Sequence, residues 1–166
     1  MAVFMPPDHE DRQALPDYQE VCQMSEADNR AFLQGVFAET AKGNGRPFID
    51  ALADEVRWTI IGQTAWSRTY EGKRAVLEEL LHPLAEQLGG RNLVSAERFV
   101  ADDDVVVVEG RNHSVTASGR DYPNRYCWIF VMRDGKVAEI TEYTDTQLIA
   151  EVLAPPPAAP SPYRPR

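Results

Sequence analysis

The second half of the chain is a run of β-rich segments, and this run limits the possible folds more than any other feature. Apolar and β-branched residues form four stretches, near 92–101, 104–116, 124–133 and 136–144. The pair Asp134-Gly135 separates the last two. Asp and Gly tolerate the positive φ angles of a tight turn, so this pair between apolar runs predicts a β-hairpin. The sequence therefore predicts a meander of antiparallel strands.

The first half of the chain has the spacing of amphipathic helices instead. Ser25 and Asp28 have the pattern of a helix N-cap, and apolar residues then recur at helical spacing up to Gly43. A second, short helix is expected at 47–54, because it begins with a proline, which the first turn of a helix tolerates. The stretch 56–62 follows as a strand.

A third helix is expected from Gly72 to about residue 88, bent at Pro83. A short helical pattern at 146–153 ends the series, and Asp145 before it is expected to be its N-cap. Helices followed by a long-stranded sheet and a terminal helix predict an α+β fold, with the helices covering one face of the sheet.

The two ends of the chain differ from its middle. Residues 1–20 are rich in proline and charge without periodicity, and residues 154–166 contain six prolines. Proline favours extended, solvated backbone over packed helix or central strand. We therefore expect one domain at 21–153, a flexible segment before it and a disordered tail after it.

The composition argues against two classes of partner. The net charge is -9 and the isoelectric point is about 4.8, whereas nucleic acids and anionic membrane surfaces bind clusters of Lys and Arg. No stretch is apolar enough for a membrane-spanning helix, and the N-terminus lacks the pattern of a secretion signal. The sequence therefore predicts a cytoplasmic protein that binds neither nucleic acid nor membrane.

Motifs for metals and cofactors are not found in the sequence. Cys22 and Cys127 lie far apart without the spacing of a zinc site, so we expect two free thiols. The sequence also has no Gly-rich phosphate loop and no nucleophile elbow. We therefore expect neither a metal nor a cofactor.

The segment 125–132 is apolar on both faces of the expected strand. Tyr126, Trp128, Phe130 and Met132 alternate with Cys127, Ile129 and Val131. One set can line a core or a pocket, and the other set then needs a partner, most simply a second copy of the chain. We therefore expect a homodimer.

Three stretches resemble the nuclear transport factor two-like superfamily, especially its SnoaL-like and ketosteroid-isomerase-like branches. They are ALADEVRWTIIG at 51–62, YEGKRAVLEEL at 70–80 and DYPNRYCWIFVMRDGKVAEITEYTDT at 121–146. The resemblance implies a cone-shaped, curved antiparallel sheet with three helices on its concave face and a short C-terminal helix. It also implies a half-open apolar cavity and, usually, a homodimer. Functions vary widely in this superfamily, so the fold does not decide the function.

The catalytic residues of ketosteroid isomerases have no counterparts in this chain. These enzymes use a tyrosine, an aspartate and a second acid. Their positions fall near Val36, near Thr59, and at Cys127 or Trp128. None of these side chains has the required chemistry, which argues against a steroid isomerase of that type.

Limonene-epoxide-hydrolase-like members resemble the chain at one catalytic position, where Glu142 stands in the last strand. Their other two polar residues fall near Gly110 and Asn112 or, with a shift of one residue, near Glu109 and Arg111. Both registers stay open, because such a shift exchanges the two faces of a strand.

Glu142 and His113 are the candidate catalytic residues. A carboxyl group in an apolar cavity has a raised pKa, which suits Glu142 for acid/base chemistry near neutral pH. His113 is a second candidate base, because histidine titrates near neutral pH. The candidate substrate-binding residues are aromatic: Trp58, Tyr126, Trp128, Phe130 and Tyr143.

Two classes of function are compatible with this pattern. The first is an isomerase, cyclase or hydrolase-like enzyme that acts without a cofactor on a small apolar organic molecule by acid/base chemistry. The second is a ligand-binding or assembly domain that keeps the pocket but lacks the reactive groups. Glu142 inside an apolar cavity, near a second polar group, favours the first, whereas Glu142 in solvent favours the second.

Overall fold

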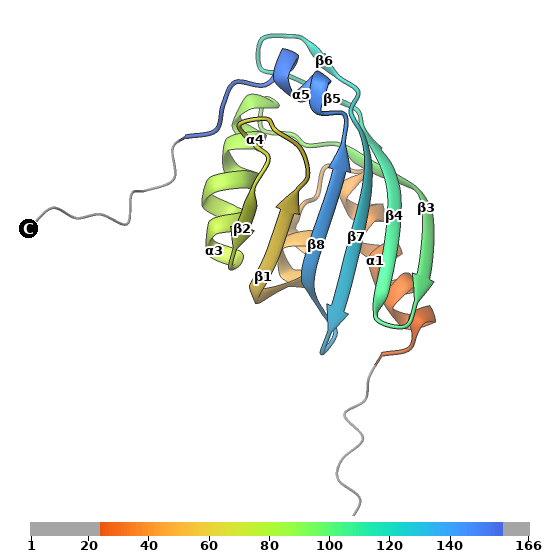
Figure 1. Cartoon of the computed structure of the whole chain (residues 1–166). Coiled ribbons are helices and arrows are strands. Elements are labelled where there is room, and N and C mark those ends of the chain that lie inside the picture. The colour runs from red at the N-terminus through yellow and green to blue at the C-terminus, as the bar shows by residue number, and fades with distance from the viewer. Residues whose placement is uncertain (1–23, 158–166) are drawn as a thin grey trace, which may run out of the picture.

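A computed structural model describes residues 24–157, which form an α+β fold (Figure 1). The helical elements are α1 (Glu26–Thr40), α2 (Arg46–Ala51), α3 (Lys73–Ala75), the π-helical turn η1 (Val76–Leu81), α4 (His82–Gln87) and α5 (Thr146–Val152). The strands are β1 (Leu52–Ile60), β2 (Thr69–Glu71), β3 (Val94–Asp102), β4 (Val105–Asn112), β5 (Ser114–Val115), β6 (Asp121–Tyr122), β7 (Arg125–Arg133) and β8 (Lys136–Thr144).

Six strands form one curved sheet in the order β2-β1-β8-β7-β4-β3, and β5 pairs with β6 in a small separate ribbon. The expected meander of β3, β4, β7 and β8 is antiparallel, as predicted. The turn between β7 and β8 uses Asp134 and Gly135, both at positive φ. The pair of β1 and β8 is parallel, so the first long strand lies beside the last one.

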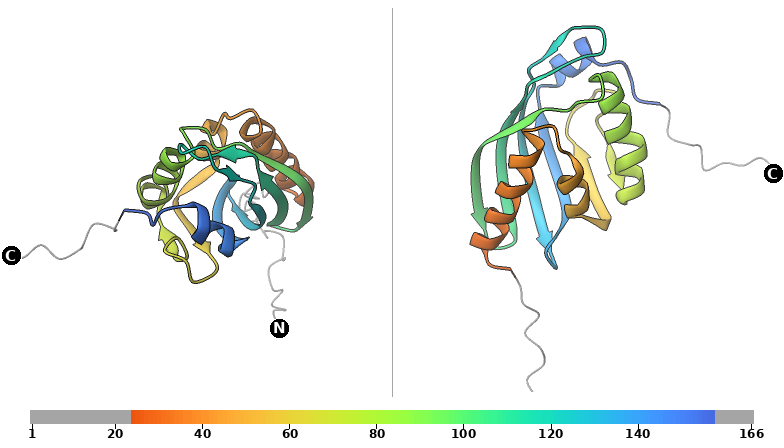
Figure 2. Two further views of the ribbon diagram at one scale, coloured as in Figure 1. Left: turned by 90° about the horizontal axis from the view of Figure 1, so that it is seen from above. Right: turned by 180° about the vertical axis from the view of Figure 1, so that it is seen from behind.

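The sheet curls around the helices, so that the molecule has the shape of an open cone (Figure 2). Helix α1 packs against β3, α2 follows α1, and the run from α3 to α4 lies near β1 and β2. The core between these layers includes Leu33, Phe37, Val56, Phe130 and Ile140. The predicted α+β fold with three helices on the concave face and a short final helix is confirmed.

Local sequence explains where several helices begin. Ser25 and Asp28 form a capping box at α1, in which each side chain accepts a hydrogen bond from the other residue's backbone N–H. The Asp145 carboxylate accepts from the Leu148 N–H at 3.1 Å and caps α5. Both caps agree with the sequence prediction.

The third helix is interrupted by the π-helical turn η1 immediately before Pro83. The N–H of His82 donates to the carbonyl of Leu77, five residues earlier. A proline in a helix lacks a backbone donor, and its ring crowds the carbonyl four residues earlier, so a wider turn relieves the conflict. The expected bend at Pro83 therefore takes the form of a π-helical turn.

The predicted boundary between the second helix and the first strand was wrong by several residues. Helix α2 ends at Ala51, and β1 already begins at Leu52. Leu52 pairs with Val137 of β8, and the register shifts before Arg57. Pairing with a distant strand therefore outweighs the local helical pattern of residues 52–54.

The C-terminal part of the described chain is tied to the body at Ala154, which the sequence prediction assigned to the tail. The Ala154 carbonyl accepts from the indole of Trp66 at 3.0 Å and from the Gln87 amide at 3.1 Å. The Ala154 N–H donates to the Gln87 side-chain oxygen at 2.7 Å. The packed body therefore extends at least to Ala154, whereas residues 1–23 and 158–166 lie outside the described range.

Two further sequence predictions concern membrane-spanning helices and the cysteine thiols. No helix in the described range 24–157 is long and apolar enough to cross a membrane. The Cys127 thiol is free and half-buried, and Cys22 lies outside the described residues.

Candidate functional site

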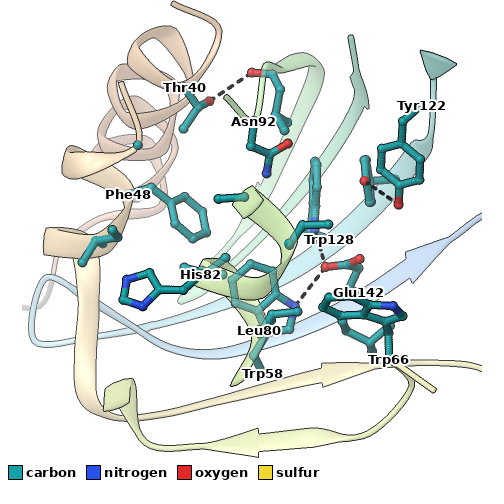
Figure 3. A pocket seen from close by; sticks show the side chains of 18 of the residues that line it. Thr40, Phe48, Trp58, Trp66, Leu80, His82, Asn92, Tyr122, Trp128 and Glu142 are labelled. Carbon is teal, nitrogen blue, oxygen red and sulfur yellow. Dashed lines mark hydrogen bonds between the residues drawn. The ribbon is translucent and has the colours of Figure 1, made fainter. Parts of the chain in front are cut away.

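A cavity of about 250 Å³ lies between the inner face of the sheet and the helices (Figure 3). Aromatic side chains form much of its wall: Phe37, Phe48, Trp58, Trp66, Tyr126 and Trp128. Exposed residues among its lining, Gly45 and Gly90 with His82, mark the side that opens to solvent. Tyr122, Ile149 and Leu153 also line the cavity and are buried.

Glu142 projects from β8 into this cavity and is 6% exposed. Trp128 stands directly opposite it on β7, and Ile60 stands opposite it on β1. Trp58, two residues before Ile60, is therefore the diagonal neighbour of Glu142 on the same face of the sheet. The strand registers thus bring two indoles and one carboxyl together.

Both indoles donate to the same oxygen of Glu142. The Nε1 of Trp58 lies 3.0 Å from Oε2, and the Nε1 of Trp128 lies 3.1 Å from it. Figure 3 shows the two bonds meeting at one carboxyl oxygen, while the other oxygen carries none. Oε1 has no hydrogen-bond partner within residues 24–157, and this atom is not fully buried. Oε1 is therefore the oxygen that is available to the cavity.

Burial raises the pKa of Glu142 to about 7, because the apolar surroundings disfavour the ionised form. The N–H groups of Trp128 and Trp58 act in the opposite direction, since hydrogen bonds to the carboxylate stabilise its charge. The balance leaves a carboxyl group that can take or give a proton near neutral pH.

A second polar group of the cavity lining is the hydroxyl of Tyr122. The Tyr122 hydroxyl oxygen accepts from Asn124 Nδ2 at 2.8 Å and from the Tyr126 hydroxyl at 3.4 Å. Among the described residues no acceptor is found for the Tyr122 O–H itself. Burial raises the pKa of both tyrosines, so both stay neutral at physiological pH. Tyr122 can therefore donate to an oxygen of a ligand.

Few charged side chains line the cavity. Glu142 is its one acidic side chain, and neither Lys nor Arg occurs among the described lining residues. His82 is exposed at the rim. The described residues also contain no group of three or more His, Cys, Asp or Glu side chains that could hold a metal ion.

The structure brings four of the seven predicted site residues together. Trp58, Tyr126, Trp128 and Glu142 all line the cavity. Phe130 lies on the same face but outside the lining, fully buried in the core against Phe37 and Phe48.

Two predicted site residues point away from the cavity: Tyr143 on β8, and His113 in the link between β4 and β5. Tyr143 follows Glu142 and is 47% exposed, because neighbouring side chains in a strand point to opposite faces. His113 follows the buried Asn112 and is exposed, with its Nε2 2.7 Å from the Ser95 hydroxyl. The placement of His113 and Tyr143 with the cavity residues is therefore corrected.

The open question of register in β4 is resolved in the same way. Gly110 and Asn112 face inward, whereas Glu109 and Arg111 lie outside and form ion pairs with Arg98 and Glu97. A Cβ atom at Gly110 would lie 3.1 Å from the Trp128 ring and 2.5 Å from the Ser95 carbonyl oxygen. The absence of a side chain at position 110 therefore makes room for Trp128.

Sequence reasoning missed several residues of the cavity, among them Trp66, His82, Asn92 and Tyr122. Trp66 lies in the connection between β1 and β2, and Asn92 lies in the connection before β3, where no periodicity predicts a direction. The one signal for Tyr122 was its position within the DYPN stretch of the resemblance. Tyr122 belongs to the short strand β6, which the sequence prediction did not include.

Comparisons with known proteins agree with this fold and cavity. The SnoaL-like domain family matches residues 26–140, more than half of the chain. No curated protein matches the chain at a significant level.

Three solved structures illustrate the similarity. An NTF2-like protein from Burkholderia xenovorans is 25% identical, with a TM-score of 0.61 over 79% of this chain and 99% of its own. A putative SnoaL-like polyketide cyclase from Jannaschia sp. CCS1 is 20% identical, with a TM-score of 0.61 over 84% of this chain and 99% of its own. TerC, co-crystallized with polyporic acid, is 20% identical, with a TM-score of 0.62 over 75% of this chain and 96% of its own. The chain therefore belongs to the SnoaL-like domain family of the NTF2-like superfamily.

Proposed function

We propose that the protein is an enzyme that moves a proton on a small, uncharged and largely apolar organic molecule, with Glu142 as the general acid and base. The observation that carries this proposal is the carboxyl group of Glu142, buried in an aromatic cavity with one oxygen facing the open space. A buried carboxyl group without a cationic partner is costly to the folded state, so its presence favours a functional role.

The chemistry follows from the two protonation states of Glu142. The carboxylate accepts a proton from an acidic C–H or O–H of the ligand, and the resulting acid returns a proton to another atom of the ligand. The pKa of Glu142, raised to about 7 by burial, keeps both states accessible at neutral pH. A single carboxyl group then supports an isomerisation, and also the proton transfers of a ring closure.

Tyr122 supplies the complementary group. When Glu142 removes a proton from a carbon next to a carbonyl, negative charge develops on the carbonyl oxygen. A neutral phenol whose proton has no acceptor within residues 24–157 can donate to that oxygen and stabilise the charge.

The cavity also limits the class of substrate. Its wall carries neither Lys nor Arg among the described residues, so a carboxylate or phosphate group on the ligand would find no cationic partner there. Its volume of about 250 Å³ lies near the lower end of ligand pockets, which suits a molecule of one or two rings. The similarity to a putative polyketide cyclase and to TerC with polyporic acid supports a small-molecule ligand.

Exchange of ligand hydrogen for deuterium tests the proposal without knowledge of the product. The protein is incubated in D2O with a panel of uncharged one-ring and two-ring ketones and phenols, and deuterium uptake is followed by NMR. We expect catalysed exchange with part of the panel. Glu142→Gln is expected to lower that exchange rate by about two to four orders of magnitude while ligand binding persists.

Glu139→Gln is the matched control, because Glu139 lies on the same strand but on the outer face, paired with Arg133 at 2.7 Å. This variant is expected to catalyse deuterium exchange of the ligand at the rate of the unmodified protein. Ligand binding without any catalysed exchange would favour a ligand-binding domain over an enzyme. Full exchange in Glu142→Gln would contradict the role of Glu142 as the general acid and base.

We also propose that the protein is a homodimer through the outer face of the sheet. Val100 on β3, Val107 on β4 and Ile129 on β7 lie side by side in register there, and Val100 is 53% exposed. Burial of this apolar row against a second copy contributes about 25 cal/mol for each Å² of apolar surface removed from water.

Analytical ultracentrifugation at micromolar concentration tests the dimer. We expect the mass of two chains for the unmodified protein and of one chain for Ile129→Asp, with unchanged circular dichroism. A monomeric unmodified protein would contradict this assembly.

A further inference from the structure

Two indole N–H groups converge on one oxygen of Glu142 and leave the other oxygen to the cavity. We propose that Trp58 and Trp128 are positioning residues that make Oε1 the sole proton-exchanging oxygen of Glu142. The inference rests on the proposed acid/base role of Glu142 and adds which atom performs it and what keeps that atom in place.

The first argument is the number of acceptor positions. A carboxylate oxygen has two lone pairs that accept hydrogen bonds. The N···O distances of 3.0 and 3.1 Å to Oε2 both lie in the ordinary range for N–H donors. The two indoles therefore use both positions of Oε2. A proton that binds Glu142 goes to Oε1, which has no partner within residues 24–157.

The second argument is that proton exchange leaves this arrangement unchanged. In the neutral acid, Oε2 is the carbonyl oxygen and accepts from both indoles, while Oε1–H points to the cavity. In the carboxylate, Oε2 keeps the same two hydrogen bonds and Oε1 becomes an acceptor. Neither the carboxyl group nor the indoles need to rotate, so the site is preorganised for both directions of transfer.

The third argument is that packing holds both indoles in place. Trp128 stacks on Tyr126 with ring centres 4.5 Å apart and an angle of 12°. Trp58 packs against Phe48 with ring centres 5.7 Å apart. Trp58 and Trp128 are each 6% exposed, so neither indole has room to turn its N–H to water.

Among the described residues, the other titratable groups near Glu142 do not stabilise its carboxylate in place of the two indoles. Burial raises the pKa values of Tyr70 on β2, Tyr122 on β6 and Tyr126 on β7, and the charge of Glu142 raises them further, so all three are neutral at physiological pH. His82 on α4 is exposed at the rim. Burial raises the pKa of Glu142, and the N–H groups of Trp128 and Trp58 lower it. Without a cationic side chain among the described lining residues, these N–H groups stabilise the ionised form.

The unmodified protein contains an internal control, because the whole chain has three tryptophans. Trp66 also lines the cavity, but its indole donates to the Ala154 carbonyl instead. We expect the indole N–H resonances of Trp58 and Trp128 to shift with pH at the same midpoint as the Glu142 side-chain carbon. The Trp66 resonance is expected not to follow this midpoint. An NMR titration in which neither indole follows Glu142, or all three do, overturns the proposal.

Single replacements then measure what each donor contributes. Trp58→Phe and Trp128→Phe keep an aromatic ring but remove the N–H, so each is expected to raise the Glu142 pKa by about one unit. Trp66→Phe is the matched control and is expected to leave it unchanged. Folded Trp58→Phe and Trp128→Phe proteins with an unshifted Glu142 contradict the inference.

The titration separates this inference from the proposed function, because it needs no substrate. If Glu142→Gln keeps full deuterium exchange while both indoles still titrate with Glu142, the proposed reaction is wrong and the hydrogen-bond arrangement stands. If Glu142→Gln loses exchange but the indoles do not titrate with Glu142, the reaction stands and the positioning role is wrong.

Discussion

The two faces of the six-stranded sheet share their strands but differ in chemistry. On β8, Glu142 faces inward and is 6% exposed, whereas Glu139 faces outward and is paired with Arg133. Burial raises the pKa of Glu142 to about 7, with two indoles as its hydrogen-bond partners. The same residue type is therefore a candidate acid and base on one face and an ordinary surface partner on the other. The two differ because alternation along β8 directs Glu142 into the packed interior and Glu139 to the outer face.

The largest expected contrast concerns stability. Phe130→Ala on the inner face is expected to lower the free energy of unfolding by about 3–5 kcal/mol, because the ring is fully buried against Phe37 and Phe48. Ile129→Ala, one residue away on the outer face, is expected to cost about 1 kcal/mol in the single chain. Urea unfolding measures both. Equal losses that do not depend on protein concentration would remove the contrast between the faces.

The second contrast is in the pH dependence of stability. The folded pKa of Glu142, about 7, lies above its ordinary value of 4.5, so the folded chain keeps a proton that the unfolded chain has lost between these values. Stability is therefore expected to fall by about 3 kcal/mol as the pH rises from about 4.5 to about 7, and to level off above that range.

Glu142→Gln does not titrate and is expected to lack this decrease, so it should be more stable than the unmodified protein at pH values above the folded pKa. Glu139→Gln is expected to keep the decrease. Unfolding curves at acidic and alkaline pH provide the measurement. A decrease of the same size in Glu142→Gln would assign the pH dependence to other groups.

The third contrast concerns closure of the inner face. A chain that ends at Val152 loses Leu153 from the cavity wall and the hydrogen bonds of Ala154 to Trp66 and Gln87. We expect it to be about 2 kcal/mol less stable than a chain that ends at Pro157. Thermal unfolding of the two truncated chains compares them directly. Identical melting temperatures would mean that the cavity does not depend on this segment.

The smallest expected effect is at His113. Its side chain is exposed and bonded to Ser95, so His113→Ala is expected to change stability by no more than about 0.5 kcal/mol. Deuterium exchange of a ligand is expected to be unaffected. A large loss of exchange in this variant would return His113 to the list of catalytic candidates.

The sequence was informative wherever a local rule applies. Turn chemistry located the hairpin at Asp134-Gly135, side-chain capping located Asp145, and both were confirmed. Alternation separated the residues of β4 into two sets but did not tell which set faces inward, because both sets contain residues that suit an interior. In the observed register Gly110 faces inward, where a side chain would collide with the Ser95 carbonyl oxygen and crowd the Trp128 ring.

The positions of the missed residues are determined by contacts between segments that are distant in the sequence. Trp66 comes from a connection without periodicity, and its position depends on Ala154, 88 residues later. Leu52 left the expected helix because β8 was available to pair with it. No pattern within a short window of sequence contains this information.

The parallel pair of β1 and β8 has a consequence for how the protein folds. Trp58 and its hydrogen-bond partner Glu142 are 84 residues apart, and the paired residues of β1 and β8 are similarly far apart in the sequence. Closing so long a loop is entropically costly, and contacts of large sequence separation slow folding. During synthesis, the β1 side of the cavity must wait until nearly all of the domain has left the ribosome. The site is therefore absent from any shorter intermediate, and ligand binding reports on completed folding.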